Sequence, residues 1–424
     1  MNGEKVGLLA QTPHGRLTFH YDRIWLSNES GRALSLSMPL TDQPYSGDIV
    51  ENYFDNLLPD SLPIRNRMQK RFGAKSNRGF DLLWHVGRDC VGAIQLSPED
   101  IKIDVRKILS EPLSDSDIAE TLKNYRTMPL GMREDNDFRI SLAGAQEKTA
   151  FLKLKGEWHL PLGATPTSHI FKLPIGRIDH ANMDLSDSVE NEWLCLAVLK
   201  AYGLRVAHAE MQTFEDTKTL VVERFDRRWA SRDLWLMRLP QEDMCQALSS
   251  SPELKYEADG GPGIGQIMKL LLASNISLED RKTFITQVFL FWILGAIDGH
   301  AKNFSIFLLP GGEFLLTPAY DVMSAYPLVA SGSLNRKELR MAMALRSKNS
   351  HYEWDRMLPR HWLATAKKCN FPEDEMSLII ERVLEEMDQV IEKVGSSLPE
   401  GFPEHIATAI FDGMREARDR FQGY

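Results

Sequence analysis

The chain has 424 residues, of which 43% are hydrophobic and 26% charged, values that are ordinary for a globular protein and argue against disorder. Its length is too great for one ordinary core and predicts two or three domains. The formal net charge of −9 is unfavourable for wrapping nucleic acid over the whole surface, although a local basic patch is compatible with it.

Cysteine usage and hydrophobicity predict a cytoplasmic protein without membrane contact. The four cysteines form no tight pair and no metal-ligand spacing, which is typical of a reducing compartment. The N-terminus lacks the pattern of a secretory signal. The most apolar stretch, 288–297, is much shorter than the roughly 20 apolar residues that a membrane span needs. It therefore indicates a buried helix.

The first half of the chain is predicted to be rich in strands. RLTFHYD, at 16–22, alternates apolar and polar residues as a half-buried strand does. Ser114 has the position of a helix N-cap, and Gly203 is a suitable helix end. We expect helices at about 47–71, 80–86, 115–125 and 188–202, and strand-containing segments at 138–154, 169–174 and 219–227.

After about residue 245 the pattern becomes helical, with one interruption at 298–322 that has the order loop, strand, Gly-Gly hairpin, strand, loop. A β-rich half followed by a helical half predicts an α+β protein, in which a cleft between two lobes is a common ligand site. We expect helices at 264–273, 281–297, 361–368, 373–394 and 403–420, and domains at 1–110, 111–245 and 246–424.

The segment Asp298-Gly-His-Ala-Lys-Asn303 has the spacing of a phosphoryl-transfer loop. That reaction needs a carboxylate that orients the attacking hydroxyl and an oxygen ligand for Mg²⁺ close by. Asp-x4-Asn is the spacing of the protein-kinase catalytic loop. Asp321 follows just past the hairpin, where a kinase keeps its second metal-binding aspartate. Because loops also contain Asp and Asn for turn reasons, the hypothesis depends on all three residues in this order.

Lys172 lies inside an apolar strand, Ile-Phe-Lys-Leu-Pro. A lysine there is costly unless its ammonium is paired or reaches a cleft. Kinases use such a strand lysine to hold the α- and β-phosphates, paired with a helix glutamate. The following helix offers Glu190 and Glu192, and the sequence does not decide between them. The alternative is an edge-strand lysine that extends to water.

Three further segments suit a nucleotide or substrate site. SLAGAQEK, 141–148, places small residues between two strands, where backbone N–H groups can approach phosphates. Glu223, Arg224 and Phe225 follow an apolar strand that leads toward the helical half, and backbone groups at such a hinge can bind adenine. The glycine-rich segment 255–265 fits a substrate groove and an ordered loop equally. The alternative for 141–148 is an ordinary hairpin loop, and the alternative for 223–225 is a simple connecting strand.

Several long and unusual blocks of the sequence resemble the HipA toxin family. They occur in family order over about residues 138–370, and the first 110 residues and the C-terminal helices are similar more loosely. The resemblance implies a two-lobed protein-kinase-like fold with a β-rich N-terminal lobe and an all-helical C-terminal lobe. The blocks are SLAGAQEKTAF, HIFKLPIG, MDLSDSVENE, VERFDRRW, RLPQEDMCQ, KYEADGGPGI, DGHAKNFS, TPAYDV and PRHWLATAK.

The resemblance also implies an ATP-dependent serine/threonine kinase with Asp298 as its catalytic base and Asn303 and Asp321 as Mg²⁺ ligands. Ser141 matches a serine that family members phosphorylate on themselves. This modification switches them off, and a phosphate in the loop that covers ATP would repel the nucleotide. The implied ATP-binding residues are Ala143, Gly144, Ala145, Gln146, Glu147, Lys148, Lys172, Glu223, Arg224, Phe225, His300, Ala301, Lys302, Asn303, Tyr320 and Asp321.

HipA-family proteins are the toxins of toxin–antitoxin pairs. The resemblance therefore implies a HipB-like helix-turn-helix antitoxin as partner. It also implies glutamyl-tRNA synthetase as the substrate, whose phosphorylation stalls translation. Lys367 and Lys368 match a stretch that contacts operator DNA in a family complex. Asn370 stands in that stretch in place of a basic residue and supplies no charge. We therefore expect contact with DNA mainly through the antitoxin.

Two other functions are compatible with the same residues. One is a catalytically silent corepressor that binds the antitoxin on operator DNA, against which the presence of Asp298, Asn303, Asp321 and Lys172 argues. The other is an enzyme that transfers a different part of ATP, or that acts on a small molecule, because the same metal ligands serve any Mg·ATP chemistry. The mass of the product distinguishes phosphoryl from adenylyl transfer.

Overall fold

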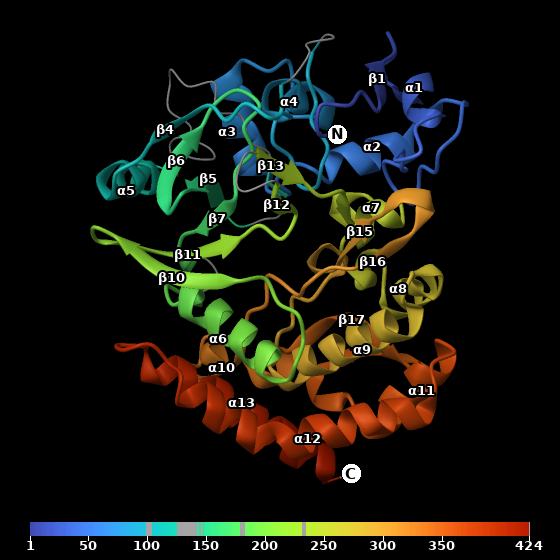
Figure 1. Cartoon of the computed structure of the whole chain (residues 1–424). Coiled ribbons are helices and arrows are strands. Elements are labelled where there is room, and N and C mark those ends of the chain that lie inside the picture. Colours follow the sequence, from blue (N-terminus) through green and yellow to red (C-terminus); the bar gives the residue numbers. More distant parts are fainter. Residues whose placement is uncertain are drawn as a thin grey trace. The chain divides into compact units, whose positions relative to one another are not determined.

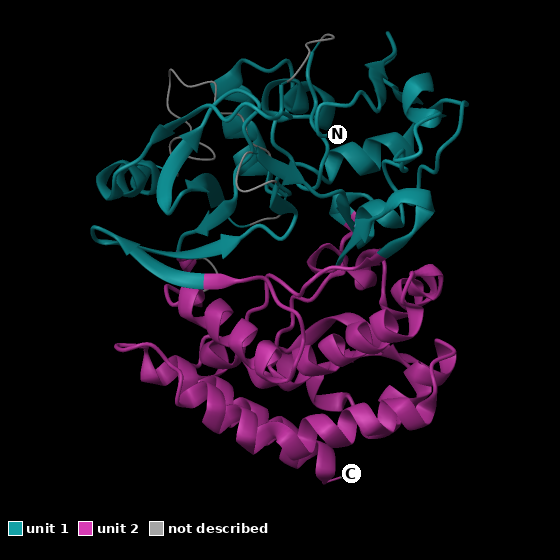
Figure 2. Cartoon of the chain, in the orientation of Figure 1, with its two compact units in different colours: residues 1–173, 210–253, 305–314 teal, residues 174–209, 254–304, 315–424 magenta. Residues whose placement is uncertain are grey.

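Helices and strands both contribute to the fold (Figure 1), which confirms the predicted α+β class. The chain forms two compact units, each built from separate stretches of the sequence (Figure 2). Unit 1 comprises residues 1–173, 210–253 and 305–314, and unit 2 comprises residues 174–209, 254–304 and 315–424. The computed structural model describes residues 1–98, 104–124, 142–143, 146, 148–178, 183–230 and 235–423.

The largest sheet of unit 1 has six strands in the order β10-β11-β7-β5-β6-β4. β7 lies between β5 and β11 and pairs with both in antiparallel fashion. Its core face carries Phe171, which meets Phe151 of β5 edge-on with 4.9 Å between the ring centroids. The strands are β4 (Ser110–Pro112), β5 (Lys148–Leu154), β6 (Glu157–Pro161), β7 (His169–Lys172), β10 (Ala209–Phe214) and β11 (Thr217–Glu223).

A smaller sheet with helices forms the N-terminal part of unit 1. We predicted one helix over about 47–71, and this was wrong, because the chain forms two helices there. Pro59 lies in the break and lacks the N–H that a continuing helix needs. Pro63 lies in the first turn of the second helix, where proline is tolerated. The elements are β1 (Gly7–Gln11), β2 (Leu17–Tyr21), α1 (Arg23–Leu26), β3 (Tyr45–Ser46), α2 (Asp48–Asp55), α3 (Leu62–Phe72) and α4 (Gly79–Val86).

The predicted cap at Ser114 is confirmed. Its Oγ accepts from the Asp117 N–H at 3.2 Å, and the Asp117 carboxylate accepts from the Ser114 N–H at 3.0 Å. This reciprocal arrangement satisfies two backbone donors at the start of α5 (Asp115–Lys123). The sequence pattern therefore predicted this helix start correctly.

A three-stranded sheet connects distant parts of the chain. β14 (Gln241–Asp243) pairs in antiparallel fashion with β15 (Ser305–Leu308), which directly follows the Asp298–Asn303 loop, and β16 (Phe314–Leu316) completes the order β14-β15-β16. α7 (Met244–Ala247) begins directly after β14. β12 (Arg227–Ala230) and β13 (Trp235–Arg238) form a separate two-stranded sheet.

Unit 2 is mainly helical and is centred on buried aromatic side chains. Trp292 near the end of α9 stacks on Trp354 with 5.4 Å between ring centroids, and each indole Nε1 donates to the other residue's carbonyl, at 3.0 and 2.7 Å. These bonds fix the end of α9, from which the chain enters the Asp298 loop. The helices are α6 (Ser188–Ala201), α8 (Ile264–Leu270), α9 (Ser277–Ile293), α10 (Tyr326–Ala330), α11 (Pro359–Lys368), α12 (Glu373–Gly395) and α13 (Glu404–Gln422).

Unit 2 also contains two small antiparallel sheets, β8 (Gly176–Ile178) with β9 (Met183–Leu185), and β17 (Arg340–Arg346) with β18 (Ser350–Glu353). The sequence analysis missed β17, because the run Met-Ala-Met-Ala-Leu is buried throughout and consists of good helix formers. None of the described helices combines the length and apolar character that crossing a membrane requires.

β14 carries a buried carboxyl group, Glu242. Its Oε1 accepts from the Leu36 N–H at 2.8 Å, and its Oε2 has no hydrogen-bond partner among the residues that the structure describes. Burial raises the pKa of Glu242 to about 8, because the charged form loses its hydration. The folded chain therefore keeps this proton at pH values at which an unfolded chain loses it.

This proton makes stability depend on pH. Its contribution is fully present below the ordinary glutamate pKa of about 4.3 and is lost as the pH rises toward the folded pKa. Glu242→Gln keeps the shape and cannot ionise. Between pH 5 and pH 8, the free energy of unfolding of Glu242→Gln, measured by urea denaturation, should rise relative to that of wild type by up to about 1.4 kcal/mol per pH unit. The matched control is Glu120→Gln on the exposed face of α5, and the same pH trend in both variants would contradict a buried neutral carboxyl.

Candidate functional site

The loop after α9 brings seven of the predicted site residues together within unit 2. The His300 N–H lies 2.8 Å from the Asp298 carbonyl oxygen and 3.1 Å from Asn303 Oδ1, and the Asn303 N–H donates to the His300 carbonyl at 2.9 Å. These bonds close a tight turn that fixes Asp298 relative to Asn303. The seven residues are Asp298, His300, Ala301, Lys302, Asn303, Tyr320 and Asp321.

Gly299 lies within this turn, where a side chain would not fit. A Cβ at this position would lie 2.4 Å from the ring of Phe291, a buried residue of α9. The loop therefore packs directly against the helix that precedes it. This contact explains why glycine follows the predicted catalytic aspartate.

Asp321 approaches the same turn from the other side of the hairpin. The Asn303 Nδ2 lies 3.3 Å from the Asp321 carbonyl oxygen and 3.4 Å from its Oδ2, and the Tyr320 hydroxyl donates to the Lys302 carbonyl at 2.8 Å. Asp321 has a φ of 59°, in the left-handed region that few residues other than glycine, asparagine and aspartate tolerate. Strained backbone of this kind concentrates at functional sites.

Buried side chains from two helices hold the segments around Asp321. Asn191 of α6 donates to the Ser324 carbonyl and accepts from the Ser324 N–H, both at 2.8 Å. Asp280 of α9 accepts from the Leu316 N–H at 2.9 Å. The sequence analysis considered Glu190 and Glu192 but not the asparagine between them, because a single buried amide has no recognisable pattern. The choice of glutamate partner for Lys172 stays open.

Asp321 and Asn303 offer a carboxylate and an amide oxygen, the donor types that Mg²⁺ prefers. As placed, the amide turns its nitrogen toward Asp321. A half-turn of the amide exchanges oxygen and nitrogen. It would give up the bond from the His300 N–H to Asn303 Oδ1, while the same N–H also donates to the Asp298 carbonyl. The residues therefore fit a metal ion. The part of the chain that the structure describes contains no group of three or more His, Cys, Asp or Glu ligands. Mg²⁺ that is bound to a nucleotide usually needs only one or two carboxylate ligands from the protein, because the phosphates supply others.

Tyr256 belongs to this constellation, although the sequence analysis did not assign it. Its hydroxyl donates to Asp298 Oδ1 at 2.6 Å, and its ring meets the His300 ring edge-on with 5.0 Å between centroids. It lies in the glycine-rich segment 255–265, for which a substrate groove and an ordered loop were both predicted. That segment was the available signal, but nothing in it distinguished the tyrosine.

In unit 1, two predicted phosphate-binding lysines are neighbours. Lys148 of β5 and Lys172 of β7 are directly opposite in the antiparallel register, so both side chains lie on the same face of the sheet. Both lysines interact with other groups in the structure, and Lys172 is buried.

The other predicted residues of unit 1 are only partly described. Gln146 Nε2 donates to the Leu173 carbonyl at 3.1 Å, which ties its loop to the end of β7, and Ala143 is partly exposed. Phe225 meets Phe307 of β15 edge-on, with 5.8 Å between ring centroids. Ser141, Gly144, Ala145 and Glu147 lie outside the described residues.

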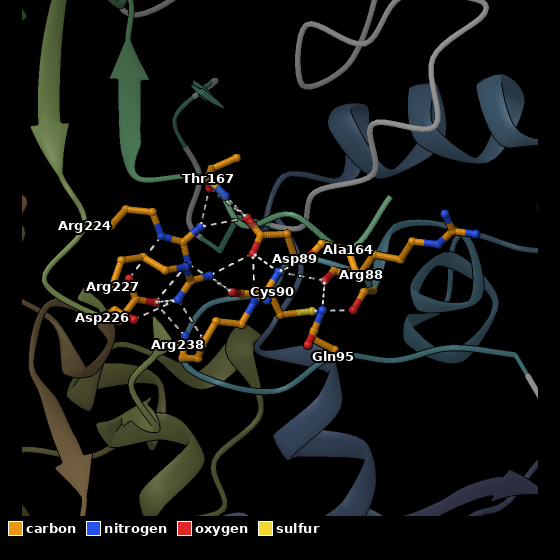
Figure 3. Close-up of polar contacts among 12 residues, drawn as sticks. Arg88, Asp89, Cys90, Gln95, Ala164, Thr167, Arg224, Asp226, Arg227 and Arg238 are labelled. Atoms are coloured by element: carbon orange, nitrogen blue, oxygen red, sulfur yellow. Dashed lines mark hydrogen bonds and ion pairs between the residues drawn. The ribbon is translucent and has the colours of Figure 1, made fainter. Parts of the chain in front are cut away.

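Arg224, beside Glu223 at the end of β11, points into a buried ion network (Figure 3). Asp89 lies at its centre, where its carboxylate meets three guanidinium groups. They belong to Arg224, Arg227 and Arg238, at 3.3, 2.9 and 3.0 Å. Asp226 also pairs with Arg224 and Arg227, at 2.9 Å each. The network thus joins the segment after α4 to the predicted hinge.

The network has one positive charge in excess, because three arginines face two aspartates. Burial raises the pKa of Asp89, but the three arginines outweigh this effect and hold that pKa well below its ordinary value. Arg224 also donates to Thr167 Oγ1 at 2.8 Å and through its backbone N–H to the Ser168 carbonyl at 2.9 Å. Its side chain therefore anchors the strand end and is directed into the protein.

Removing the central anion should destabilise unit 1 strongly. Asp89→Asn leaves three buried guanidinium groups with one aspartate, and breaking a buried pair in this way costs about 3–5 kcal/mol. We expect a loss of that size in urea denaturation at pH 7. The matched change Asp42→Asn, at an exposed site, should stay within about 0.5 kcal/mol of wild type. Equal effects of the two changes would contradict the central place of Asp89.

Comparison with known proteins gives the chain a family. The model of the HipA N-terminal domain matches residues 1–97, and that of the HipA-like C-terminal domain matches residues 140–391. A protein of Sinorhizobium fredii named "Putative kinase Y4mE" is 33% identical over 351 residues, 81% of each chain.

Two comparisons with proteins from Shewanella oneidensis add a relative in sequence and a likeness in fold. The serine/threonine-protein kinase toxin HipA of that organism is 26% identical over 316 residues, 72% of this chain and 69% of the relative. A solved complex of HipA, HipB and operator DNA from the same organism contains a chain with a TM-score of 0.81 and 23% identity, covering 99% of this chain and 95% of that one. That likeness shows the same fold. From the domain matches and the rhizobial relative, the chain belongs to the HipA family.

Proposed function

We propose that the chain is an ATP-dependent kinase that transfers the γ-phosphoryl group to a serine or threonine hydroxyl of a protein, as the toxin of a toxin–antitoxin pair. The observation that carries this proposal is the hydrogen-bonded constellation of Asp298, Asn303 and Asp321 in unit 2. Its order and spacing match the needs of phosphoryl transfer. The kinase names of two relatives support the same chemistry.

In this proposal Asp298 is the base that orients the attacking hydroxyl. It is exposed, so a substrate can reach it. Asn303 and Asp321 would hold Mg²⁺, which would neutralise phosphate charge when bound. Lys148 and Lys172 would attract the α- and β-phosphates from their shared face of the sheet.

The remaining nucleotide contacts are proposed for the strand end and the loops. Glu223 and Phe225 would line the adenine site, with Arg224 holding their backbone through the buried network. The loop 143–148 would cover the phosphates, with His300 to Lys302 along the nucleotide and Tyr320 beside the metal ligands. Phosphorylation of Ser141, just before that loop, would repel ATP and switch the kinase off.

The proposed partner is a HipB-like helix-turn-helix antitoxin. The similar Shewanella oneidensis chain belongs to a solved complex of HipA, HipB and operator DNA. DNA would be contacted mainly through that antitoxin. Lys367 pairs with Glu373 at 3.5 Å, and Lys368 donates to the Ser347 carbonyl, so both lysines have partners within unit 2. Glutamyl-tRNA synthetase is the proposed substrate by family resemblance, in the cytoplasm.

Mass spectrometry after incubation with Mg·ATP tests the chemistry. Wild type should gain one phosphoryl group, at Ser141, whereas Asp298→Asn should gain it about 10² to 10⁴ times more slowly, because general-base help is lost. Asp374→Asn, at an exposed site in α12, is the matched control and should behave as wild type. An adenylyl addition would assign the other chemistry. No addition to an unphosphorylated, ATP-binding sample would favour the corepressor.

Asp321→Asn tests the metal ligand. Asparagine tolerates the left-handed backbone as aspartate does, so the fold should persist while the negative charge is lost. We expect the affinity for Mg·ATP, measured by calorimetry, to fall at least about tenfold, with little change in affinity for ATP in EDTA. Unchanged Mg·ATP affinity in a folded variant would remove Asp321 from the proposed metal site.

A further inference from the structure

We infer that Tyr256 is a positioning residue that holds the Asp298 carboxylate in the orientation required to accept a proton from the substrate hydroxyl. The inference rests on the proposed kinase function and deepens it. It starts from the 2.6 Å hydrogen bond between the Tyr256 hydroxyl and Asp298 Oδ1. A bond from a phenol to an ionised carboxylate is of the short, charge-assisted kind.

The segment that carries Tyr256 is built as a rigid turn. The Tyr256 carbonyl accepts from the Asp259 N–H at 3.1 Å and from the Gly261 N–H at 2.9 Å. A Cβ on Gly261 would lie 1.8 Å from the Leu254 carbonyl oxygen, so only glycine permits this closure. These contacts hold the turn that carries the tyrosine.

The residues on both sides of Tyr256 are anchored to different elements. The Lys255 carbonyl accepts from the Ala301 N–H at 3.2 Å, which ties the turn to the Asp298–Asn303 loop itself. The Glu257 carboxylate accepts from the Ala344 N–H of β17 at 2.6 Å and from the Arg346 Nε at 3.1 Å. With both neighbours held, the tyrosine ring has little freedom to leave Asp298.

Asp298 needs this support because of its own chemistry. The torsion that rotates an aspartate carboxylate is broad, and Asp298 is exposed. The bond to Oδ1 restricts that rotation. The bond from Tyr256 uses Oδ1 and leaves the second oxygen, Oδ2, as the acceptor for the substrate hydroxyl. Tyr256 thus acts through Asp298.

Tyr256→Phe removes only the hydroxyl and keeps the ring against His300. We expect kcat for Mg·ATP-dependent self-phosphorylation and for ATP hydrolysis to fall about tenfold, since orientation of the base is lost. The KM for ATP and the thermal unfolding midpoint should stay as in wild type. The control is Tyr45→Phe, which removes another hydroxyl that donates to a backbone carbonyl, at Pro39 in unit 1.

A double-mutant cycle separates positioning from a general structural effect. In the Asp298→Asn background, Tyr256→Phe should have no further effect on the residual rate, because the hydroxyl no longer has a carboxylate to orient. Equal losses in both backgrounds, or wild-type kcat in Tyr256→Phe, would overturn this inference while the kinase function stands. If wild type itself neither hydrolyses ATP nor phosphorylates itself, the proposed function fails, and this inference fails with it.

Discussion

The site in unit 2 depends on one amide side chain. Asn303 accepts from a backbone N–H within its own turn and donates toward Asp321 beyond the hairpin. It thereby joins two chain segments that the sequence separates by a strand, a turn and a second strand. Because a short amide reaches both only when the turn is closed and Asp321 keeps its left-handed backbone, the loop and the strained residue stabilise one another. The Tyr320 hydroxyl, which donates to the Lys302 carbonyl, joins the same two segments beside this amide.

The supporting structure is buried, whereas the reacting group is exposed. Asn191, Asp280 and the Trp292–Trp354 pair hold the segments that lead into and out of the site from within the core of unit 2. In unit 1 the Asp89 network does the same for the strand end at Glu223. Its charges are strong in a low-dielectric interior, where an unpaired ion is costly. Rigid buried anchors therefore allow the exposed Asp298 carboxylate to keep a defined geometry.

Much of this arrangement was predictable from sequence, and the exceptions have physical reasons. The order of Asp298, Asn303 and Asp321 predicted their proximity, because reaction chemistry restricts residue type and spacing together. The Ser114 cap was equally local. Tyr256 and Asn191 were missed because their roles depend on contacts with residues far away in the sequence. Tyr256 is 42 positions from Asp298, and Asn191 is 133 positions from Ser324. The break between α2 and α3 was missed although Pro59 marked it. The domain boundaries at 110 and 245 stay predictions.

Arg224 illustrates why residue type alone is a weak guide to role. The family resemblance implies Arg224 as an ATP-binding residue, yet its guanidinium contacts Asp89, Asp226 and Thr167. The cation compensates two buried carboxylates, and its position beside the hinge follows from the need to fix that strand end to the segment after α4. A residue next to a functional segment can thus be essential to it without reaching the ligand. The same reasoning applies to Tyr256, whose single hydroxyl contributes by restricting the carboxylate that it contacts.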